Sequence, residues 1–94
     1  MNDDSRFRVC RDVRYRVVER EAVVLRQGPG EVLILNEVGA RVLQLVDEGR
    51  RLADVVAQLQ AEFDVGRNVL RRDVEVFLDE AVEAGLVEAA TEPR

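Results

Sequence analysis

The sequence predicts an α+β domain in which a three-stranded antiparallel sheet is followed by three helices, in the order β-β-β-α-α-α. Residues 13–35 place apolar residues in short runs or at every second position, which is typical of strands. From residue 36 the apolar period lengthens to about 3.6, which is typical of amphipathic helices. Because the strands are grouped before the helices, we expect the helices to cover one face of the sheet.

Three apolar stretches identify the expected strands. Residues 13–17 alternate valine or tyrosine with arginine, as a strand with one buried face does. Residues 22–25 and 32–35 are continuous apolar runs. The Gln-Gly-Pro-Gly sequence at residues 27–30 lies between these runs and favours a tight turn, so residues 22–35 are expected to form a hairpin.

Helical periodicity predicts helices near residues 36–47, 52–63 and 68–84. Asn36 and Asn68 are suitable N-caps, because an asparagine side chain accepts a hydrogen bond from a free backbone N–H, whereas Arg51 is a poor cap. Gly49 and Gly85 suit the left-handed position that ends a helix. The expected core consists of Val23, Leu25, Leu45, Val56, Leu59, Phe63, Val74, Phe77, Leu78 and Leu86.

The chain of 94 residues is long enough for one domain with a modest core. We expect an irregular, flexible N-terminal segment over residues 1–12, the domain over 13–88 and a C-terminal tail over 89–94. No apolar run approaches the roughly 18–20 residues that span a membrane, and the acidic first residues are unlike a secretory signal. We therefore expect a cytoplasmic protein without a membrane partner.

The composition argues against catalysis. The sequence has no histidine and a single cysteine, Cys10, so it lacks Ser-His and Cys-His pairs and the usual zinc ligands. Its 19 acidic side chains are far more often solvated than paired for acid–base chemistry. We expect no enzyme activity, no catalytic residue, no metal and no cofactor.

A basic segment near the N-terminus raises a nucleic-acid-binding winged helix as an alternative. Its arginines are Arg6, Arg8, Arg11, Arg14 and Arg16. However, residues 31–94 carry seven arginines against fourteen acids, a balance of −7, which repels a phosphate backbone. The expected third helix, where recognition residues would lie, has five acids and two arginines. We expect no nucleic-acid partner.

The expected third strand, residues 31–35, is the best candidate for a binding surface. Val32 and Ile34 point to one face and Leu33 and Leu35 to the other, so both faces are apolar. In a three-stranded meander this strand is also an edge, whose unpaired backbone groups can accept another strand. The alternative is a strand that helices bury on both faces.

The expected third helix is the second candidate. Val74 and Leu78 belong to its apolar stripe, and Arg71, Arg72 and Glu75 lie beside that stripe. These charges could select a peptide that carries charges of both signs. The alternative is that they are ordinary solvated helix charges.

Several segments occur in an order and spacing typical of one protein family. They are Val24-Leu25, Val32 to Asn36 with its Leu-Asn ending, Gly39 to Leu45, Asp47-Glu48-Gly49, Leu52 to Val56, Leu59, Phe63-Asp64-Val65, Asp73-Val74, Phe77-Leu78 and Ala84 to Val87. In these segments the sequence resembles the PqqD family. The resemblance implies a winged-helix-like element that recognises ribosomally made peptides.

The resemblance also implies a mode of binding. Family members bind the leader of a precursor peptide, which adds a strand beside the third strand and lies against the third helix. They then present it to a modifying enzyme, often a radical-SAM protein. The expected peptide-binding residues are Glu31, Val32, Leu33, Ile34, Leu35, Arg71, Arg72, Val74, Glu75 and Leu78. We expect Val32 and Ile34 to face the groove between this strand and this helix.

Local details differ from the members dedicated to pyrroloquinoline quinone (PQQ) synthesis. Gln27-Gly28-Pro29-Gly30 replaces their usual Pro-Glu-Gly turn, and Arg51 replaces a Thr or Ser cap. Asp47-Glu48-Gly49 and Phe63-Asp64-Val65 look closer to the leader-binding elements of lasso-peptide clusters. The resemblance therefore leaves a PQQ-type or other radical-SAM pathway and a lasso-peptide pathway open. A nucleic-acid-binding winged helix and a dimerising assembly subunit are the alternatives of another class.

Overall fold

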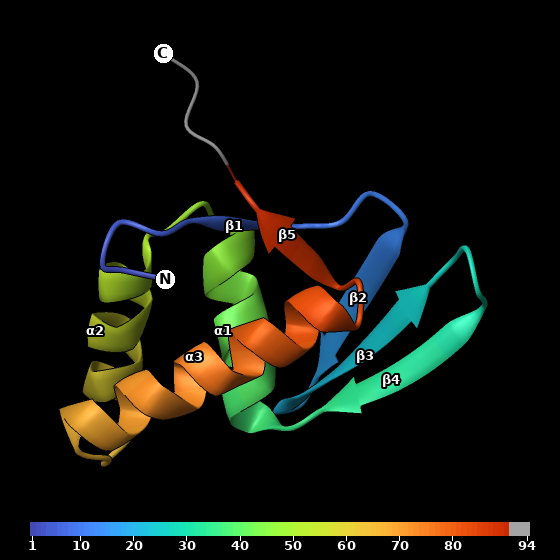
Figure 1. The fold of residues 1–94 in the computed structure, drawn as a ribbon. Helices are drawn as coiled ribbons and strands as arrows, with labels where there is room; N and C mark the ends of the chain where they lie inside the picture. The colour runs from blue at the N-terminus through green and yellow to red at the C-terminus, as the bar shows by residue number, and fades with distance from the viewer. Residues whose placement is uncertain (91–94) are drawn as a thin grey trace.

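The computed structural model describes residues 1–90, so the last four residues of the expected tail lie outside the described part. The elements in chain order are β1 (Phe7–Val9), β2 (Val13–Val18), β3 (Glu21–Arg26), β4 (Glu31–Leu35), α1 (Glu37–Asp47), α2 (Leu52–Glu62), α3 (Arg67–Glu83) and β5 (Val87–Ala89) (Figure 1). β2, β3 and β4 form an antiparallel sheet in that order, and β1 pairs antiparallel with β5. The α+β class, with a three-stranded antiparallel sheet followed by three helices, is confirmed.

The two faces of the β2-β3-β4 sheet differ in exposure. Ala22 and Val24 of β3 are fully buried, whereas Val23 and Leu25 are each 38% exposed. The expectation that Val23 and Leu25 belong to the core is therefore wrong. A continuous apolar run has no period of two, so the sequence does not reveal which residues of β3 face inward.

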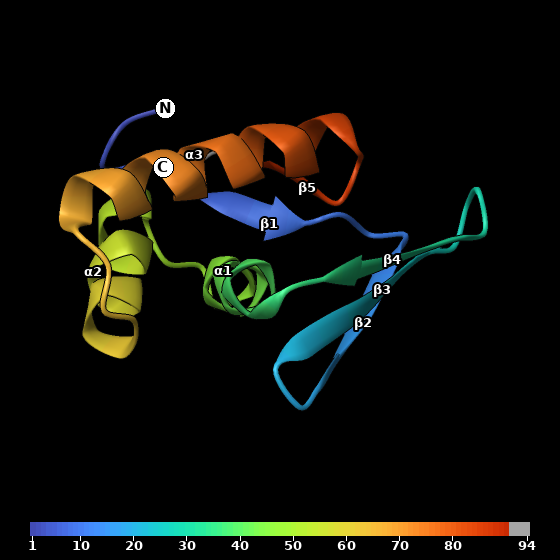
Figure 2. The same cartoon turned by 90° about the horizontal axis from the view of Figure 1, so that it is seen from below.

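The helices pack with both sheets around one core. Figure 2 shows α1 end-on between α2 and the β2-β3-β4 sheet, with α3 and β1 to one side of it. The expected core residues Leu45, Val56, Leu59, Val74, Leu78 and Leu86 are buried. Phe63 and Phe77 are only partly buried and pack against the outside of this core, which corrects the expectation for both rings.

The helix ends follow the expected caps in part. The Asn36 side chain accepts a hydrogen bond from the Gly39 N–H at 2.9 Å, which confirms Asn36 as the N-cap of α1. Gly49 and Gly85 have positive φ angles of 84° and 77° after α1 and α3, as expected. Asn68 is not a cap, because α3 begins one residue before it.

The N-terminal segment supplies the cap that α2 lacks locally. The Leu52 N–H donates to the Ser5 carbonyl at 2.8 Å, and the Ala53 N–H donates to the Asp3 carbonyl at 3.1 Å. Arg51 makes no side-chain cap hydrogen bond. Because two free N–H groups at the start of α2 are satisfied from a distant part of the chain, the helix begins without a good local cap.

Part of the segment that was expected to be irregular is a strand. Phe7 lies opposite Ala89 and Val9 opposite Val87, and the Phe7 ring is buried. The expectation of irregular structure over residues 1–12 is therefore wrong for β1. A three-residue strand is too short to produce a recognisable period, and its partner lies at the other end of the chain.

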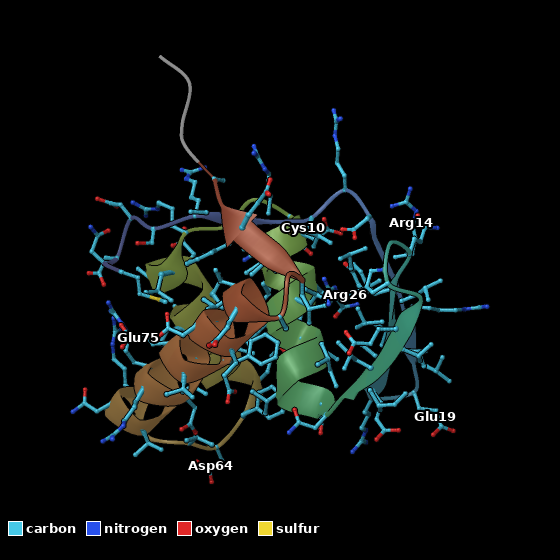
Figure 3. All side chains as sticks on the ribbon, turned by 45° about the vertical axis from the view of Figure 1, so that its right-hand side comes forward. Cys10, Arg14, Glu19, Arg26, Asp64 and Glu75 are labelled. Atoms are coloured by element: carbon cyan, nitrogen blue, oxygen red, sulfur yellow. The ribbon has the colours of Figure 1, made fainter. Side chains whose placement is uncertain are left out.

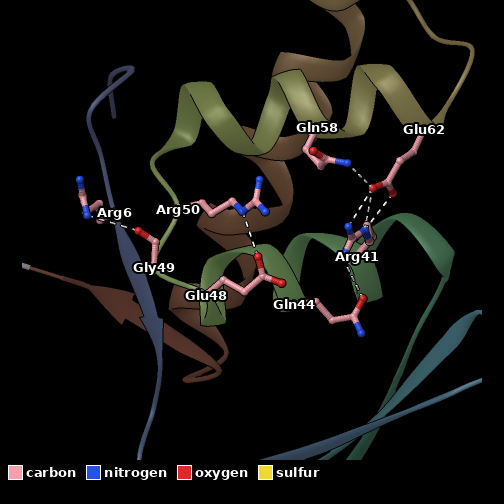
Figure 4. A network of polar contacts seen from close by, with 8 residues as sticks. All are labelled: Arg6, Arg41, Gln44, Glu48, Gly49, Arg50, Gln58 and Glu62. Atoms are coloured by element: carbon pink, nitrogen blue, oxygen red, sulfur yellow. Dashed lines mark hydrogen bonds and ion pairs between the residues drawn. The ribbon is translucent and has the colours of Figure 1, made fainter.

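An ion-pair network joins α1 to the end of α2 (Figure 4). Arg41 Nε and Nη2 each donate to the Glu62 carboxylate at 2.8 Å, and Gln58 Nε2 donates to the same carboxylate at 2.8 Å. Hydrogen bonding from Arg41 lowers the pKa of Glu62. The network fixes α2 relative to α1, and with it the point from which the chain enters α3.

Candidate functional site

β4 is an edge strand with one open side. It pairs in the sheet with β3 alone, so alternate residues direct their backbone N–H and C=O groups away from the sheet. Glu31 is the only charged residue of β4, and the strand contains no proline or bulge that would block further pairing. An extended peptide can therefore add to β4 as another strand.

An apolar groove of about 320 Å³ lies between β4 and the C-terminal half of α3. It is lined by Leu33, Ile34, Leu35, Asn36, Phe77, Glu80, Ala81, Ala84 and Leu86. Ala81 and Ala84 are small, so this part of the helix leaves room beside the strand. The groove and the open edge of β4 are neighbours, as strand addition with side-chain recognition requires.

A second hollow, of about 360 Å³, lies between the start of α1 and the middle of α3. Asn36, Phe77 and Glu80 line both this hollow and the apolar groove. A Cβ atom on Gly39 would lie 3.0 Å from Cε1 of Phe77. The absence of a side chain at Gly39 therefore lets the Phe77 ring sit close to α1, at the junction of the two hollows.

Arg26 lies at the opposite end of β4 from this junction. Its Nη1 pairs with Glu31 Oε1 at 3.1 Å, and its guanidinium packs against Gly85, just after α3. Its Nε is buried and has no hydrogen-bond partner among residues 1–90. Since Gly85 lies beside Arg26 and Phe77 lies beside Gly39, α3 and β4 run in opposite directions along the groove.

The structure corrects which residues of β4 face inward. Leu33 and Leu35 are half-buried and pack against the core, whereas Val32 and Ile34 are 60% and 59% exposed on the other face. Val32 does not line the groove, which corrects the expectation for that residue, whereas Ile34 lines it together with Leu33 and Leu35. As in β3, both parities of this strand are apolar, so the sequence pattern does not distinguish its faces.

The residues expected on α3 are divided between three places. Val74 and Leu78 are buried, at 0% and 1% exposure, although Val74 also borders the second hollow with Arg72. Arg71 pairs with Glu75 and with Asp3 of the N-terminal segment. Glu75 lies on the side of α3 away from β4 (Figure 3). None of the five helix residues lines the apolar groove.

Sequence reasoning missed the groove residues Phe77, Glu80, Ala81 and Ala84. They recur at helical spacing on one face of α3. The sequence feature that could have indicated this groove is Ala81 and Ala84 on the same helical face as Phe77, because small side chains beside a bulky ring leave a hollow. Of the residues predicted from the sequence, Val74 and Leu78 belong to the apolar stripe of the helix, which is its core face.

The outer face of the sheet is apolar on one half and cationic on the other. Across the strands, Arg14 lies opposite Leu25 and Leu25 opposite Val32; in the next row, Arg16, Val23 and Ile34 are similarly aligned. The four apolar side chains in these rows are exposed. Arg14 donates to backbone carbonyls, and neither arginine pairs with a carboxylate among the described residues.

The described residues hold few other reactive groups. No cluster of three histidine, cysteine or acidic side chains within residues 1–90 is placed to hold a metal ion. Burial, together with Glu88 and Asp12, raises the pKa of the Cys10 thiol, which disfavours the reactive thiolate. No helix in this part of the chain is long and apolar enough to cross a membrane.

Comparison with known proteins gives concordant matches. Residues 21–87 match the family model described as Coenzyme PQQ synthesis protein D (PqqD). A PqqA binding protein of Gluconobacter oxydans (strain 621H) is 28% identical over 61 residues, which are 65% of this chain and 64% of that protein. The chain thus spans less than two thirds of the length of this relative.

Two solved structures share the fold. TbiB1 in complex with the TbiA(beta) leader peptide has a TM-score of 0.82 and 28% identity, over 90% of this chain and 99% of TbiB1. Lasso peptide synthetase B1 complexed with its leader peptide has a TM-score of 0.80 and 27% identity, over 87% of this chain and 96% of that protein. Because the family model covers most of the chain, from β3 to the start of β5, this protein belongs to the PqqD family.

Proposed function

We propose that this domain binds the leader of a ribosomally made precursor peptide and presents it to a peptide-modifying enzyme, without catalysing a reaction itself. The observation that carries the proposal is the open edge of β4 beside the apolar groove on α3. One surface thus offers both the backbone groups and the apolar side chains that an extended peptide requires.

The peptide lies antiparallel to residues 31–35 and continues the sheet. Its backbone N–H and C=O groups bond to those on the free edge of β4, at about 0.5–1.5 kcal/mol for each hydrogen bond. Every second side chain enters the groove against Leu33, Leu35, Ala81 and Ala84. Full burial of one leucine-sized side chain contributes about 1.5–3 kcal/mol, so a few such anchors supply most of the affinity.

The relatives support a leader peptide as the ligand. The two structural neighbours were solved with leader peptides, and the curated relative is described as a PqqA binding protein. A PQQ-type or other radical-SAM pathway is the first assignment, and a lasso-peptide pathway is the alternative. The cytoplasm, where precursor peptides are made, is the proposed location.

The enzyme partner contacts the outer face of the sheet. Val32 and Ile34 project there from the same strand that holds the peptide, beside Val23 and Leu25. A protein docked on this face would touch both the domain and the outward side chains of the bound peptide. Retaining both partners raises the local concentration of the peptide at the enzyme, which is how a domain without chemistry can accelerate modification.

The test uses peptides that the domain itself selects. A random library of 14-residue peptides is displayed and enriched on the full chain, and an enriched peptide is titrated into isotope-labelled protein. We expect amide shifts to cluster on residues 31–35 and 77–84. Shifts confined to the arginines of residues 6–16, or no enriched peptide, would contradict leader binding.

Two further measurements address the alternatives of another class. Binding to duplex DNA that weakens steeply with salt would favour a nucleic-acid-binding winged helix. Sedimentation that shows a tight dimer whose β4 edges are protected from amide exchange would favour an assembly subunit. Leader binding predicts neither result.

A further inference from the structure

Among residues 1–90, Glu80 is the only charged residue that lines the apolar groove between β4 and α3. It is exposed, and its carboxylate has no hydrogen bond or ion pair with any described residue. Its position in a mainly apolar groove means that a bound peptide would remove water from around the carboxylate. A cation on the peptide would offset that loss of hydration, whereas an acid would increase it.

The fold fixes where along the groove this carboxylate lies. Phe77 packs beside Gly39, just beyond the Leu35 end of β4, and Gly85 packs beside Arg26, at the Glu31 end. Glu80 is one turn from Phe77 and further from Gly85, and it also lines the second hollow. Glu80 therefore lies toward the Leu35 end of the groove.

The direction of the peptide follows from antiparallel pairing. A peptide antiparallel to β4 has its N-terminal residues near Leu35 and its C-terminal residues near Glu31. It therefore passes Glu80 first and then reaches the space beside Ala81, Ala84 and Leu33. Side chains on one face of a strand recur at every second residue, about 6.6–6.8 Å apart, so the peptide residues that follow the one beside Glu80 enter this space at alternate positions.

We propose that the domain selects peptides in which one basic residue and two apolar residues follow one another at every second position, with the basic residue first. The carboxylate of Glu80 pairs with the basic side chain. The inference rests on the proposed function, since it assumes strand addition to β4. The other charges near the site do not provide this selection. Arg72 and Asp73, which line the second hollow, have opposite charges, and Arg26 is paired with Glu31.

The matched control is Glu83, another exposed acid on α3 that does not line the groove. Glu80→Gln and Glu83→Gln change the net charge equally, and both positions tolerate a neutral side chain because they face solvent. Glu80→Arg reverses the charge at the groove. The display selection is carried out in parallel on the unmodified chain and on these three variants.

We expect lysine or arginine to be enriched at one fixed position before the apolar pair with the unmodified chain and with Glu83→Gln. Glu80→Gln should lose this enrichment, and Glu80→Arg should replace it with aspartate or glutamate. For one synthetic peptide from the first selection, Glu80→Gln should weaken binding about two- to five-fold at low salt, with less effect at high salt. Glu83→Gln should change the affinity by less.

The outcomes separate this inference from the proposed function. If enriched peptides shift the amides of residues 31–35 but show no basic preference, the role of Glu80 is wrong and leader binding stands. The same conclusion follows if the preference persists unchanged in Glu80→Gln. If no peptide is enriched, or if the enriched peptides leave residues 31–35 unperturbed, the proposed function fails and the inference fails with it.

Discussion

The guanidinium of Arg26 fills the space that a side chain on Gly85 would occupy. A Cβ atom on Gly85 would lie 2.9 Å from Nη2 of Arg26, and the backbone at Gly85 is left-handed, with a φ of 77°. This contact joins the end of the β3–β4 hairpin to the turn after α3. The contact lies next to Ala84 and Leu86 in the chain, and both of these residues line the groove.

Gly85→Ala is expected to reduce stability more than Gly49→Ala. Both glycines follow a helix with positive φ, but a Cβ on Gly49 would meet nothing within 4 Å. Substitution of Gly49 by alanine should therefore cost only the left-handed backbone conformation, about 1–2 kcal/mol, whereas Gly85→Ala must also move the end of the flexible Arg26 side chain and should cost slightly more. Urea unfolding measures both, and equal losses would show that Arg26 moves aside freely.

The single tyrosine should make stability fall at alkaline pH. Tyr15 donates a hydrogen bond to Asp47 Oδ2 at 2.8 Å. Desolvation, followed by this bond and by the charges of Asp47 and Glu48, raises the pKa of Tyr15 above its ordinary value. The folded state therefore keeps a proton that the unfolded state releases above about pH 10. The contribution of Tyr15 to the free energy of unfolding is thus fully present below that pH and is lost as the pH rises further.

Tyr15→Phe is the control for this alkaline loss. It removes the titrating group, so the free energy of unfolding should depend less on pH above about pH 10 than it does in the unmodified chain. The sequence has one tyrosine and no tryptophan, so the absorbance of the phenolate reports this group alone. A phenol that titrates at its ordinary pKa in the folded chain would contradict the contact with Asp47.

Deletion of residues 2–5 should loosen the start of α2. It removes the two carbonyls that accept the Leu52 and Ala53 N–H groups, and loss of a helix cap lowers stability by about 1 kcal/mol. Hydrogen exchange at these two amides should accelerate. Replacing both Asp3 and Asp4 with serine removes their ion pairs with Arg71 and Arg51 but keeps the carbonyls, so exchange should change little. If hydrogen exchange accelerated equally in the deletion and in the serine variant, the ion pairs rather than the two carbonyls would protect the start of α2.

The hairpin, the three helices and the Asn36 cap could be predicted from sequence, because each depends on residues close together in the chain. The turn at residues 27–30 and the change of apolar period after residue 35 are local signals of this kind. The pairing of β1 with β5 and the capping of α2 by Asp3 and Ser5 could not be predicted. Both join distant segments through backbone groups, which every residue carries.

The edge position of β4 could be predicted from the order of the strands, but which of its residues face the core could not. In the runs that include Val24 and Leu33, the residues on both faces of the strand are apolar. Which face is buried therefore depends on what packs against it, and the sequence pattern does not show this. On α3, Val74 and Leu78 belong to the apolar stripe, and that stripe faces the core. A groove needs small residues next to large ones, and the importance of Ala81 and Ala84 emerges only once β4 is placed beside them.

Phe77 and Leu78 are neighbours in sequence that lie on different faces of α3, so their alanine variants test which face of the helix binds the peptide. Leu78 is 1% exposed in the core, whereas Phe77 is partly buried and lines both hollows. Leu78→Ala should lower stability by about 2–5 kcal/mol. Phe77→Ala should lower it by less than the roughly 3–5 kcal/mol of a fully buried ring, because part of the ring already faces solvent.

Peptide binding should show the opposite order. With a display-selected peptide, Phe77→Ala should weaken binding about ten-fold or more, since it removes a wall of the groove. Leu78→Ala should leave the affinity nearly unchanged when it is measured at a temperature where the variant remains folded. If Leu78→Ala weakens binding and Phe77→Ala does not, the peptide lies on the face of α3 that carries Val74 and Leu78, as the sequence pattern predicts.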